Sequence, residues 1–257
     1  MLILVSNDDG FFTEGIKVLA KRLRDIGDVW VVAPDREQSA SGHSLTLHRP
    51  LRAKSTKKRE NEFMVDGTPT DCVNLAVNKL MPRRPDIVVS GINRGANLGD
   101  DVTYSGTVAA ALEAALLGIP AIAMSAIPTA TDDYHYEAAA DFAAFLAEQV
   151  KNNGLTPGTL LNVNVPTETK VGDHRCVITR MGKRVYSDVV EEKLDPRKRT
   201  YYWIGGSNVG SKVDPGTDCE AAAEGRISVT PIQLDMTNYN FLPKLAKWGL
   251  PGFEGGR

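Results

Sequence analysis

Short, unbroken runs of apolar residues recur along the chain and predict buried β-strands. The runs do not alternate with polar residues, which is the pattern of strands that are covered on both faces. They are LILVS from Leu2, VWVVAP from Val29, DIVVSG from Asp86, PAIAMSA from Pro120 and TLLNVNVP from Thr159. Because strands buried on both faces are typical of parallel sheets, we expect a parallel arrangement.

Segments with helical periodicity lie between these runs. Over residues 14–25, the apolar positions Ile16, Leu19, Ala20 and Leu23 share one helix face. Further helices are expected over 70–80, 106–117 and 134–151. The alternation of strands and helices predicts a doubly wound α/β fold, with a mostly parallel sheet and helices on both of its faces.

The pattern changes after about Val165. The stretches HRCVITRM, RTYYWIGG and RISVTPI are typical of antiparallel or hairpin strands, and the charged stretch EEKLDPRKR separates the first two. We interpret residues 182–225 as a protruding β-hairpin arm within a single domain that spans residues 1–257. An arm too polar to form its own core leans on another subunit, and a mobile surface loop is the alternative. Asp218 and Glu220 are interpreted as solvated acids at a helix start.

Composition narrows the functional classes. The chain has 257 residues, 42% of them hydrophobic, and its 30 basic and 32 acidic residues give a net charge of -2. This balance predicts neither a nucleic-acid duplex nor a membrane as a partner. Cys72, Cys176 and Cys219 lack the C-x-x-C spacing, and no apolar run approaches the ~18 residues of a membrane span. A cytoplasmic protein is therefore expected.

Four loops that follow predicted strands are unusual, and most of them are long and polar. They contain SNDDG after the first strand, APDREQSASGHS after the second, INRGANLGDDVTYSGT after the third, and a stretch rich in Thr and Asp after PAIAMSA. In an open parallel sheet, ligands bind beyond the carboxyl ends of the strands. No G-x-G-x-x-G or Walker motif occurs in the chain, so a dinucleotide or NTP motif is not supported.

The adjacent Asp8 and Asp9 are the strongest chemical signal. Two carboxylates at a strand end repel each other, and a divalent cation relieves that repulsion. The alternative is that Asp9 caps the next helix and Asp8 is solvated. The loop after the second strand supplies neutral oxygen donors at Ser39 and Ser41, and the loop after the third supplies them at Asn93 and Asn97. Carboxylate, hydroxyl and amide oxygens favour one Mg²⁺ or Mn²⁺ over zinc.

Ser105, Gly106 and Thr107 precede an alanine-rich helix. Free N–H groups at that helix start and the two hydroxyls would receive a phosphate, and a plain N-cap is the alternative.

Two further features are weaker signals. Asp66-Gly67-Thr68 is like the D-G-T of aspartyl-phosphate phosphatases, but Met64 stands where their first aspartate belongs. We interpret it as a turn with Pro69 opening a helix. His43 is either a proton donor near the site or an ordinary surface histidine.

Together, ILVSNDDG, VVAPDREQSASGHSLTL, DGTPTDCV, DIVVSGINRGANLGDDVTYSGTVAAALEA, LLNVNVP and the final ISVTPIQLD resemble the SurE family of metal-dependent 5′-nucleotidases and phosphomonoesterases. The resemblance extends from Met1 to about Leu234. It implies a Rossmann-like fold whose C-terminal part exchanges elements between subunits, giving a homodimer or homotetramer. The metal ligands it implies are Asp8, Asp9, Ser39 and Asn93, and the phosphate-binding positions are Asn97, Ser105, Gly106 and Thr107.

We therefore expect hydrolysis of nucleoside 5′-monophosphates, with Asp8 and Asp9 as the catalytic carboxylates. Whether Asp8 only binds metal or also orients or attacks is left open. Side substrates would be 3′-nucleotides and short polyphosphate, and loops around Arg94 and the arm would set base preference. The rival hypotheses are a covalent aspartyl-phosphate phosphatase that uses Asp8 or Asp66, and a nucleotide-binding regulator without turnover.

Overall fold

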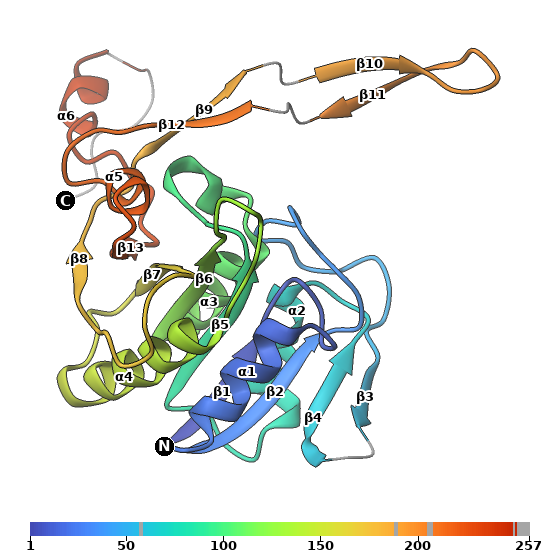
Figure 1. The fold of residues 1–257 in the computed structure, drawn as a ribbon, viewed down its shortest axis with the longest axis vertical. Coiled ribbons are helices and arrows are strands. Elements are labelled where there is room, and N and C mark those ends of the chain that lie inside the picture. Colours follow the sequence, from blue (N-terminus) through green and yellow to red (C-terminus); the bar gives the residue numbers. More distant parts are fainter. Residues whose placement is uncertain (57–58, 188–189, 205–207, 249, 251–257) are drawn as a thin grey trace.

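A nine-stranded sheet forms the centre of the computed structural model, which describes residues 1–56, 59–187, 190–204, 208–248 and 250 (Figure 1). The strand order is β3 (Ala53–Thr56), β4 (Arg59–Val65), β2 (Asp28–Pro34), β1 (Leu2–Ser6), β5 (Ile87–Arg94), β6 (Ala121–Ile127), β7 (Thr159–Pro166), β13 (Ile227–Gln233) and β8 (Cys176–Ile178).

The central part of the sheet is parallel, from β4 through β2, β1, β5 and β6 to β7. All five strands predicted from apolar runs are present, as β1, β2, β5, β6 and β7. At the edges, β3 is antiparallel to β4 and β13 is antiparallel to β7. The expectation for HRCVITRM was wrong, because β8 pairs with β13 in parallel.

Two helices cover each face of the parallel region, which confirms the doubly wound fold. The helices α1 (Glu14–Leu23) and α4 (Glu137–Asn153) pack on the face that carries Ile3 and Val5. The helices α2 (Pro69–Leu75) and α3 (Gly106–Leu116) pack on the face that carries Leu2 and Leu4. Figure 1 shows the two layers, with α1 and α4 in front of the strands. Alternating residues of β1 thus enter two separate cores.

Two of the predicted helices differ most from their predicted ranges. After α2, the chain continues as a π-helical turn, η1 (Ala76–Leu80), so the expected helix over 70–80 has two parts. The helix expected from residue 134 begins at Glu137 instead, which leaves Tyr134 and Tyr136 in the preceding loop. A short 3₁₀ turn, η2 (Gly99–Thr103), lies in the loop after β5.

Two antiparallel ribbons form a projection from the body of the protein. The first pairs β9 (Lys183–Ser187) with β12 (Asn208–Lys212), and the second pairs β10 (Val190–Leu194) with β11 (Thr200–Ile204). Figure 1 shows β10 and β11 in orange, extended away from the sheet. Residues 188–189 and 205–207 of the expected arm lie outside the described residues.

The segment after the ribbons returns to the body as α5 (Asp218–Ala223), and α6 (Leu242–Leu245) and η3 (Ala246–Trp248) follow β13. The expectation that Asp218 is solvated was wrong, because its side chain is fully buried. Its carboxylate accepts hydrogen bonds from the N–H groups of Gly99, Gly182 and Cys219, which compensate for lost hydration. In the described part of the chain, no helix is both long enough and apolar enough to cross a membrane.

Candidate active site

A pocket of about 300 Å³ opens at the carboxyl ends of β1 and β5. In the sheet, β1 lies between β2 and β5. From β1 the chain first adds strands on the β2 side and later adds β5 and β6 on the opposite side, so the strand order reverses between β1 and β5. Ligands of open α/β sheets bind at such a point. Six of the eight predicted site residues line the pocket: Asp8, Asp9, Ser39, Asn93, Asn97 and Ser105. The other two, Gly106 and Thr107, contact Asp8.

Asp8 is almost fully buried, with 3% of its surface exposed. Its Oδ1 accepts a hydrogen bond from Thr107 Oγ1. Burial raises the pKa of Asp8 above its ordinary value, although hydrogen bonds from Thr107 and nearby backbone oppose that rise. The alternative of a solvated Asp8 is therefore wrong.

Asp9 lies beside Asp8 and is partly buried. Its Oδ2 accepts a hydrogen bond from the N–H of Arg94, 3.0 Å away. Burial and the neighbouring charge of Asp8 raise the pKa of Asp9 to about 6. The capping alternative is wrong, because the N-cap residue of α1 is Thr13. Among the described residues, neither aspartate forms an ion pair with a lysine or arginine; the Arg94 guanidinium pairs with Asp132 instead.

Neutral oxygen donors stand next to the two carboxylates. Asn93 Oδ1 lies 3.3 Å from Thr107 Oγ1, the same hydroxyl that contacts Asp8, so Asn93 and Asp8 converge on one point. Its Nδ2 donates to the Gly95 carbonyl at 2.8 Å, which turns the amide oxygen toward Thr107. Ser39 is exposed, and its Oγ donates to Glu37 Oε1 at 2.6 Å.

The first turn of α3 is packed against Asp8. Ser105 is the N-cap residue, and its Oγ accepts a hydrogen bond from the N–H of Val108. A Cβ at Gly106 would lie 2.6 Å from Asp8 Cβ, so only glycine permits this approach. The positive end of the helix thus lies against a carboxylate.

Asn97 is held by asparagines of β7. Its N–H donates to Asn164 Oδ1, and its carbonyl accepts from the side chains of Asn162 and Asn164. Its Nδ2 donates to Ser125 Oγ at 2.8 Å. A signal for this support was present in LLNVNVP, because asparagines inside a buried strand need partners.

The further residues that line the pocket include three that the sequence did not assign to it, Glu37, Asp101 and Tyr104. All three belong to the long loops after β2 and β5, so loop length was the available signal. Asp101 forms an ion pair with Arg184 of β9 at 2.8 Å. The pocket wall is therefore connected to the base of the projecting ribbons.

His43 does not line the pocket. Its Nε2 lies 2.9 Å from Glu113 Oε2 on α3, and Asn74 Nδ2 donates to Glu113 Oε1 at 2.8 Å. The contact with His43 lowers the pKa of Glu113 below its ordinary value, against the effect of burial. His43 thus joins the loop after β2 to α3.

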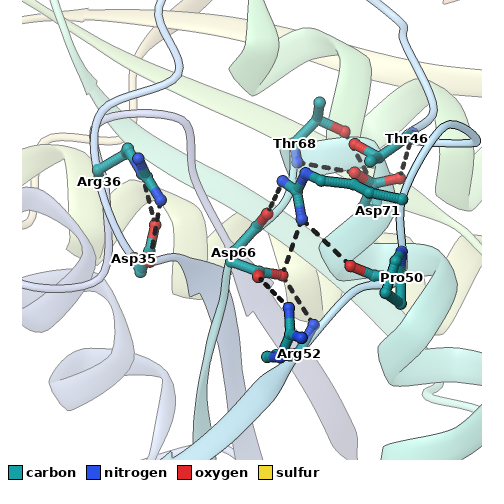
Figure 2. A network of polar contacts seen from close by, with 9 residues as sticks. Asp35, Arg36, Thr46, Pro50, Arg52, Asp66, Thr68 and Asp71 are labelled. Carbon is teal, nitrogen blue, oxygen red and sulfur yellow. Dashed lines mark hydrogen bonds and ion pairs between the residues drawn. The ribbon is translucent and has the colours of Figure 1, made fainter.

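Asp66 and its neighbours form a separate, fully paired network (Figure 2). Asp66 Oδ1 accepts from the N–H of Arg52 at 2.7 Å, and its carboxylate forms ion pairs with Arg49 and Arg52. The N–H of Arg52 and the Arg49 guanidinium hold the pKa of Asp66 below its ordinary value. Pro69 opens α2, as the sequence predicts. Thr68 caps the helix in a capping box with Asp71, which was not predicted from the sequence.

No histidine or cysteine is among the described residues that line the pocket, which is unusual for a zinc site. In the described residues, no group of three or more His, Cys, Asp and Glu side chains could hold a metal ion. The two carboxylates are accompanied by amide and hydroxyl oxygens, which suit a hard divalent cation.

Comparison with known proteins gives one consistent result. Residues 3–188 match the family described as Survival protein SurE. The chain is 56% identical over 250 residues to the 5′-nucleotidase SurE of Geobacter sulfurreducens, covering 97% of this chain and 94% of that protein. It is 54% identical over 248 residues to the 5′-nucleotidase SurE of Geotalea daltonii, covering 96% and 99%. The crystal structure of the SurE protein of Aquifex aeolicus is similar, with a TM-score of 0.82, 39% identity and coverage of 96% and 99%.

Proposed function

The chain belongs to the SurE family, and we propose that it is a 5′-nucleotidase. It hydrolyses nucleoside 5′-monophosphates to nucleoside and phosphate, and the reaction takes place at the Asp8–Asp9 pocket. The observation that carries the assignment to this pocket is the meeting of a buried and a partly buried carboxylate, neither of them in an ion pair among the described residues, with Asn93 and Ser39 at the switch point of the sheet. The similarity to 5′-nucleotidases over nearly the whole chain supports the activity.

The pocket residues fit one divalent cation, Mg²⁺ or Mn²⁺. Asp8, Asp9, Ser39 and Asn93 would hold it. Burial raises the pKa of both carboxylates, and the charge of Asp8 raises that of Asp9 further, so both gain from a nearby positive charge. Such a cation, when bound, would polarise phosphoryl oxygens and acidify a water molecule.

The chain's own groups would orient the phosphate. Asn97, fixed by Ser125 and the asparagines of β7, would donate to a non-bridging oxygen. Residues 105–107 at the start of α3 would supply hydroxyl and N–H donors once Asp8 turns toward the cation. Donors fixed before the reaction stabilise charge that develops in the transition state without reorganisation.

The test is hydrolysis of p-nitrophenyl phosphate and of a panel of nucleoside monophosphates. We expect EDTA to abolish turnover and Mg²⁺ or Mn²⁺ to restore it. The panel includes 3′-nucleotides and short polyphosphate as side substrates. Metal binding has a second readout, a rise in the thermal midpoint of the native chain that Asp8→Asn and Asp9→Asn lose. Metal-independent turnover by the native chain would refute this proposal, and a trapped phospho-aspartate at Asp66 would favour the covalent rival.

The second ribbon would make a homodimer or homotetramer by packing on another copy of the chain. Its apolar side chains Tyr201, Tyr202, Trp203 and Ile204 are exposed in the single chain. An apolar surface of this kind is typical of an interface. Light scattering should give a mass that is a multiple of 27.9 kDa. Trp203→Glu should reduce it.

A cytoplasmic location is part of the proposal. The thiols of Cys72, Cys176 and Cys219 are free, and those of Cys72 and Cys219 are buried. Unpaired cysteines are typical of a reducing compartment.

A further inference from the structure

A second cavity, of about 520 Å³, lies directly beside the reaction pocket. The two cavities share Asp9, Glu37 and Arg94 in their linings. The second one extends from Asp9 toward the loop after β6, which carries Asp132, Asp133, Tyr134 and Tyr136. A molecule whose phosphate lies at Asp8 and Asp9 can therefore place its remaining part in this cavity.

Two aromatic rings form part of its wall. Tyr134 and Tyr136 are half-buried, their ring centroids are 6.2 Å apart, and their planes differ by 17°. The Arg94 guanidinium lies over the Tyr134 ring, 5.1 Å from its centroid. Both tyrosines lie in the loop that precedes α4, which begins at Glu137, and both line the cavity. Parallel aromatic rings at the edge of a polar cavity offer a stacking surface to a flat heterocycle.

The charges of the cavity favour one orientation of a bound nucleotide. Its lining carries the carboxylates of Asp9, Glu14, Glu37, Asp132 and Asp133. The charge of Arg94 is offset by its ion pair with Asp132, 3.4 Å away. Carboxylates accept hydrogen bonds from ribose hydroxyl and base amino groups and repel a phosphate. The uncharged nucleoside, not the phosphate, fits here.

We propose that this cavity is the nucleoside subsite and that it gives the enzyme a preference for purine nucleotides, with the base stacked on the Tyr134–Tyr136 pair. The inference rests on the proposed function, because the phosphate must occupy the Asp8–Asp9 pocket. A purine presents a larger π surface to the two rings than a pyrimidine does, and ribose 5-phosphate presents none. The tyrosines therefore act on substrate binding and not on the reacting atoms.

Steady-state kinetics with three substrates test the subsite: adenosine 5′-monophosphate, cytidine 5′-monophosphate and ribose 5-phosphate. In the native enzyme, we expect kcat/KM to decrease in that order. Tyr134→Leu combined with Tyr136→Leu should lower kcat/KM for the purine nucleotide about tenfold, the typical loss when a base loses its aromatic partner. The loss should be in KM, and kcat/KM for ribose 5-phosphate should not change.

Two controls separate stacking from general damage to the loop. Tyr134→Phe and Tyr136→Phe keep the rings and should keep the purine preference. His135→Leu alters an exposed neighbour that does not line the cavity and should also keep it. A readout on the unmodified chain is competitive inhibition by adenosine, which carries no phosphate; we expect it to exceed inhibition by cytidine.

The outcomes distinguish the two proposals. Suppose that the native enzyme hydrolyses all three substrates and that Tyr134→Leu combined with Tyr136→Leu lowers kcat/KM for each by the same factor. In that case the subsite is wrong and the proposed function stands. Equal inhibition by adenosine and cytidine would also overturn the subsite. If the native enzyme with metal hydrolyses none of the three, the proposed function fails and this inference fails with it.

Discussion

Two aspartate–glycine turns lie at the carboxyl ends of parallel strands and differ in their surroundings. Asp8-Asp9-Gly10 follows β1, and Asp66-Gly67 follows β4. Asp66 is enclosed by Arg49, Arg52 and a backbone N–H, and its pKa is lowered. In the described part of the chain, neither Asp8 nor Asp9 forms an ion pair with a lysine or arginine. Burial raises the pKa of both, and the neighbouring charge of Asp8 adds to the rise at Asp9.

The comparison shows that the motif alone does not decide the chemistry of a carboxylate. A carboxylate with its own cations and N–H donors has little to gain from a ligand and stabilises the local fold. Buried carboxylates without cations destabilise the fold and gain from a bound cation. The first turn is therefore suited to a site and the second to structure.

The largest expected effect comes from neutralising the first turn. Asp8→Asn or Asp9→Asn should lower kcat/KM about 10²- to 10³-fold, the size of a lost electrostatic contribution in an active site. Both variants should raise the thermal midpoint measured in EDTA, because each removes one of two repelling charges. Nucleotide hydrolysis and calorimetry measure the two quantities.

Asp66→Asn is the matched control for these variants. It should keep native turnover and lower the thermal midpoint, because Arg49 and Arg52 lose their partner. If turnover instead depended on Asp66 and survived Asp8→Asn, the roles assigned to the two turns would be reversed.

A methyl group behind Asp8 should have the next largest effect. In Gly106→Ala, the new Cβ would meet Asp8 Cβ at 2.6 Å, so Asp8 must move. A displacement of about 1 Å in a catalytic group costs about a hundredfold in activity. The control is Gly210→Ala, whose new Cβ would lie an ordinary 3.7 Å from the Val185 carbonyl oxygen. Equal activity of both variants would show that the approach of α3 to Asp8 is dispensable.

The capping box beside the second turn should affect stability alone. Thr68→Ala removes the acceptor for the N–H of Asp71 at the start of α2 and should cost about 1 kcal/mol of unfolding free energy. Urea denaturation measures this loss, and Thr68→Ser, which keeps the hydroxyl, should restore most of it. A loss of turnover without a loss of stability would contradict a purely structural role.

The smallest effect concerns Asp86, which directly precedes β5 and therefore lies at the amino ends of the parallel strands. Hydrogen bonds from Arg83 and from the N–H of Leu2 lower the pKa of Asp86 to about 2. An aspartate in an unfolded chain has a pKa of about 3.9, so this contribution to stability is complete above about pH 4 and is lost as the pH falls toward about 2. Asp86→Asn should thus be less stable than the native chain at neutral pH, with a difference that vanishes in acid. A difference that does not depend on pH would argue against this assignment.

The sequence predicted the parallel strands well because their apolar runs are local signals. The sequence was less reliable where residues far along the chain determine the burial and the hydrogen bonds of a side chain. The solvated Asp218 was wrong, because two of its three N–H donors, Gly99 and Gly182, come from separate segments that only the folded chain brings together. The helix start at Tyr134 was wrong as well, because the periodic pattern does not reveal where the first helical residue lies.

The sequence by itself determined the doubly wound sheet, the Asp8–Asp9 pair and the oxygen donors after each strand, since residue type and spacing are properties of the chain. Tertiary structure alone decided which aspartates form ion pairs, and that Tyr134 and Tyr136 line the second cavity together with Arg94. The physical reason is that burial and charge pairing depend on neighbours far along the chain. A pKa or a stacking surface therefore exists only once those neighbours have met.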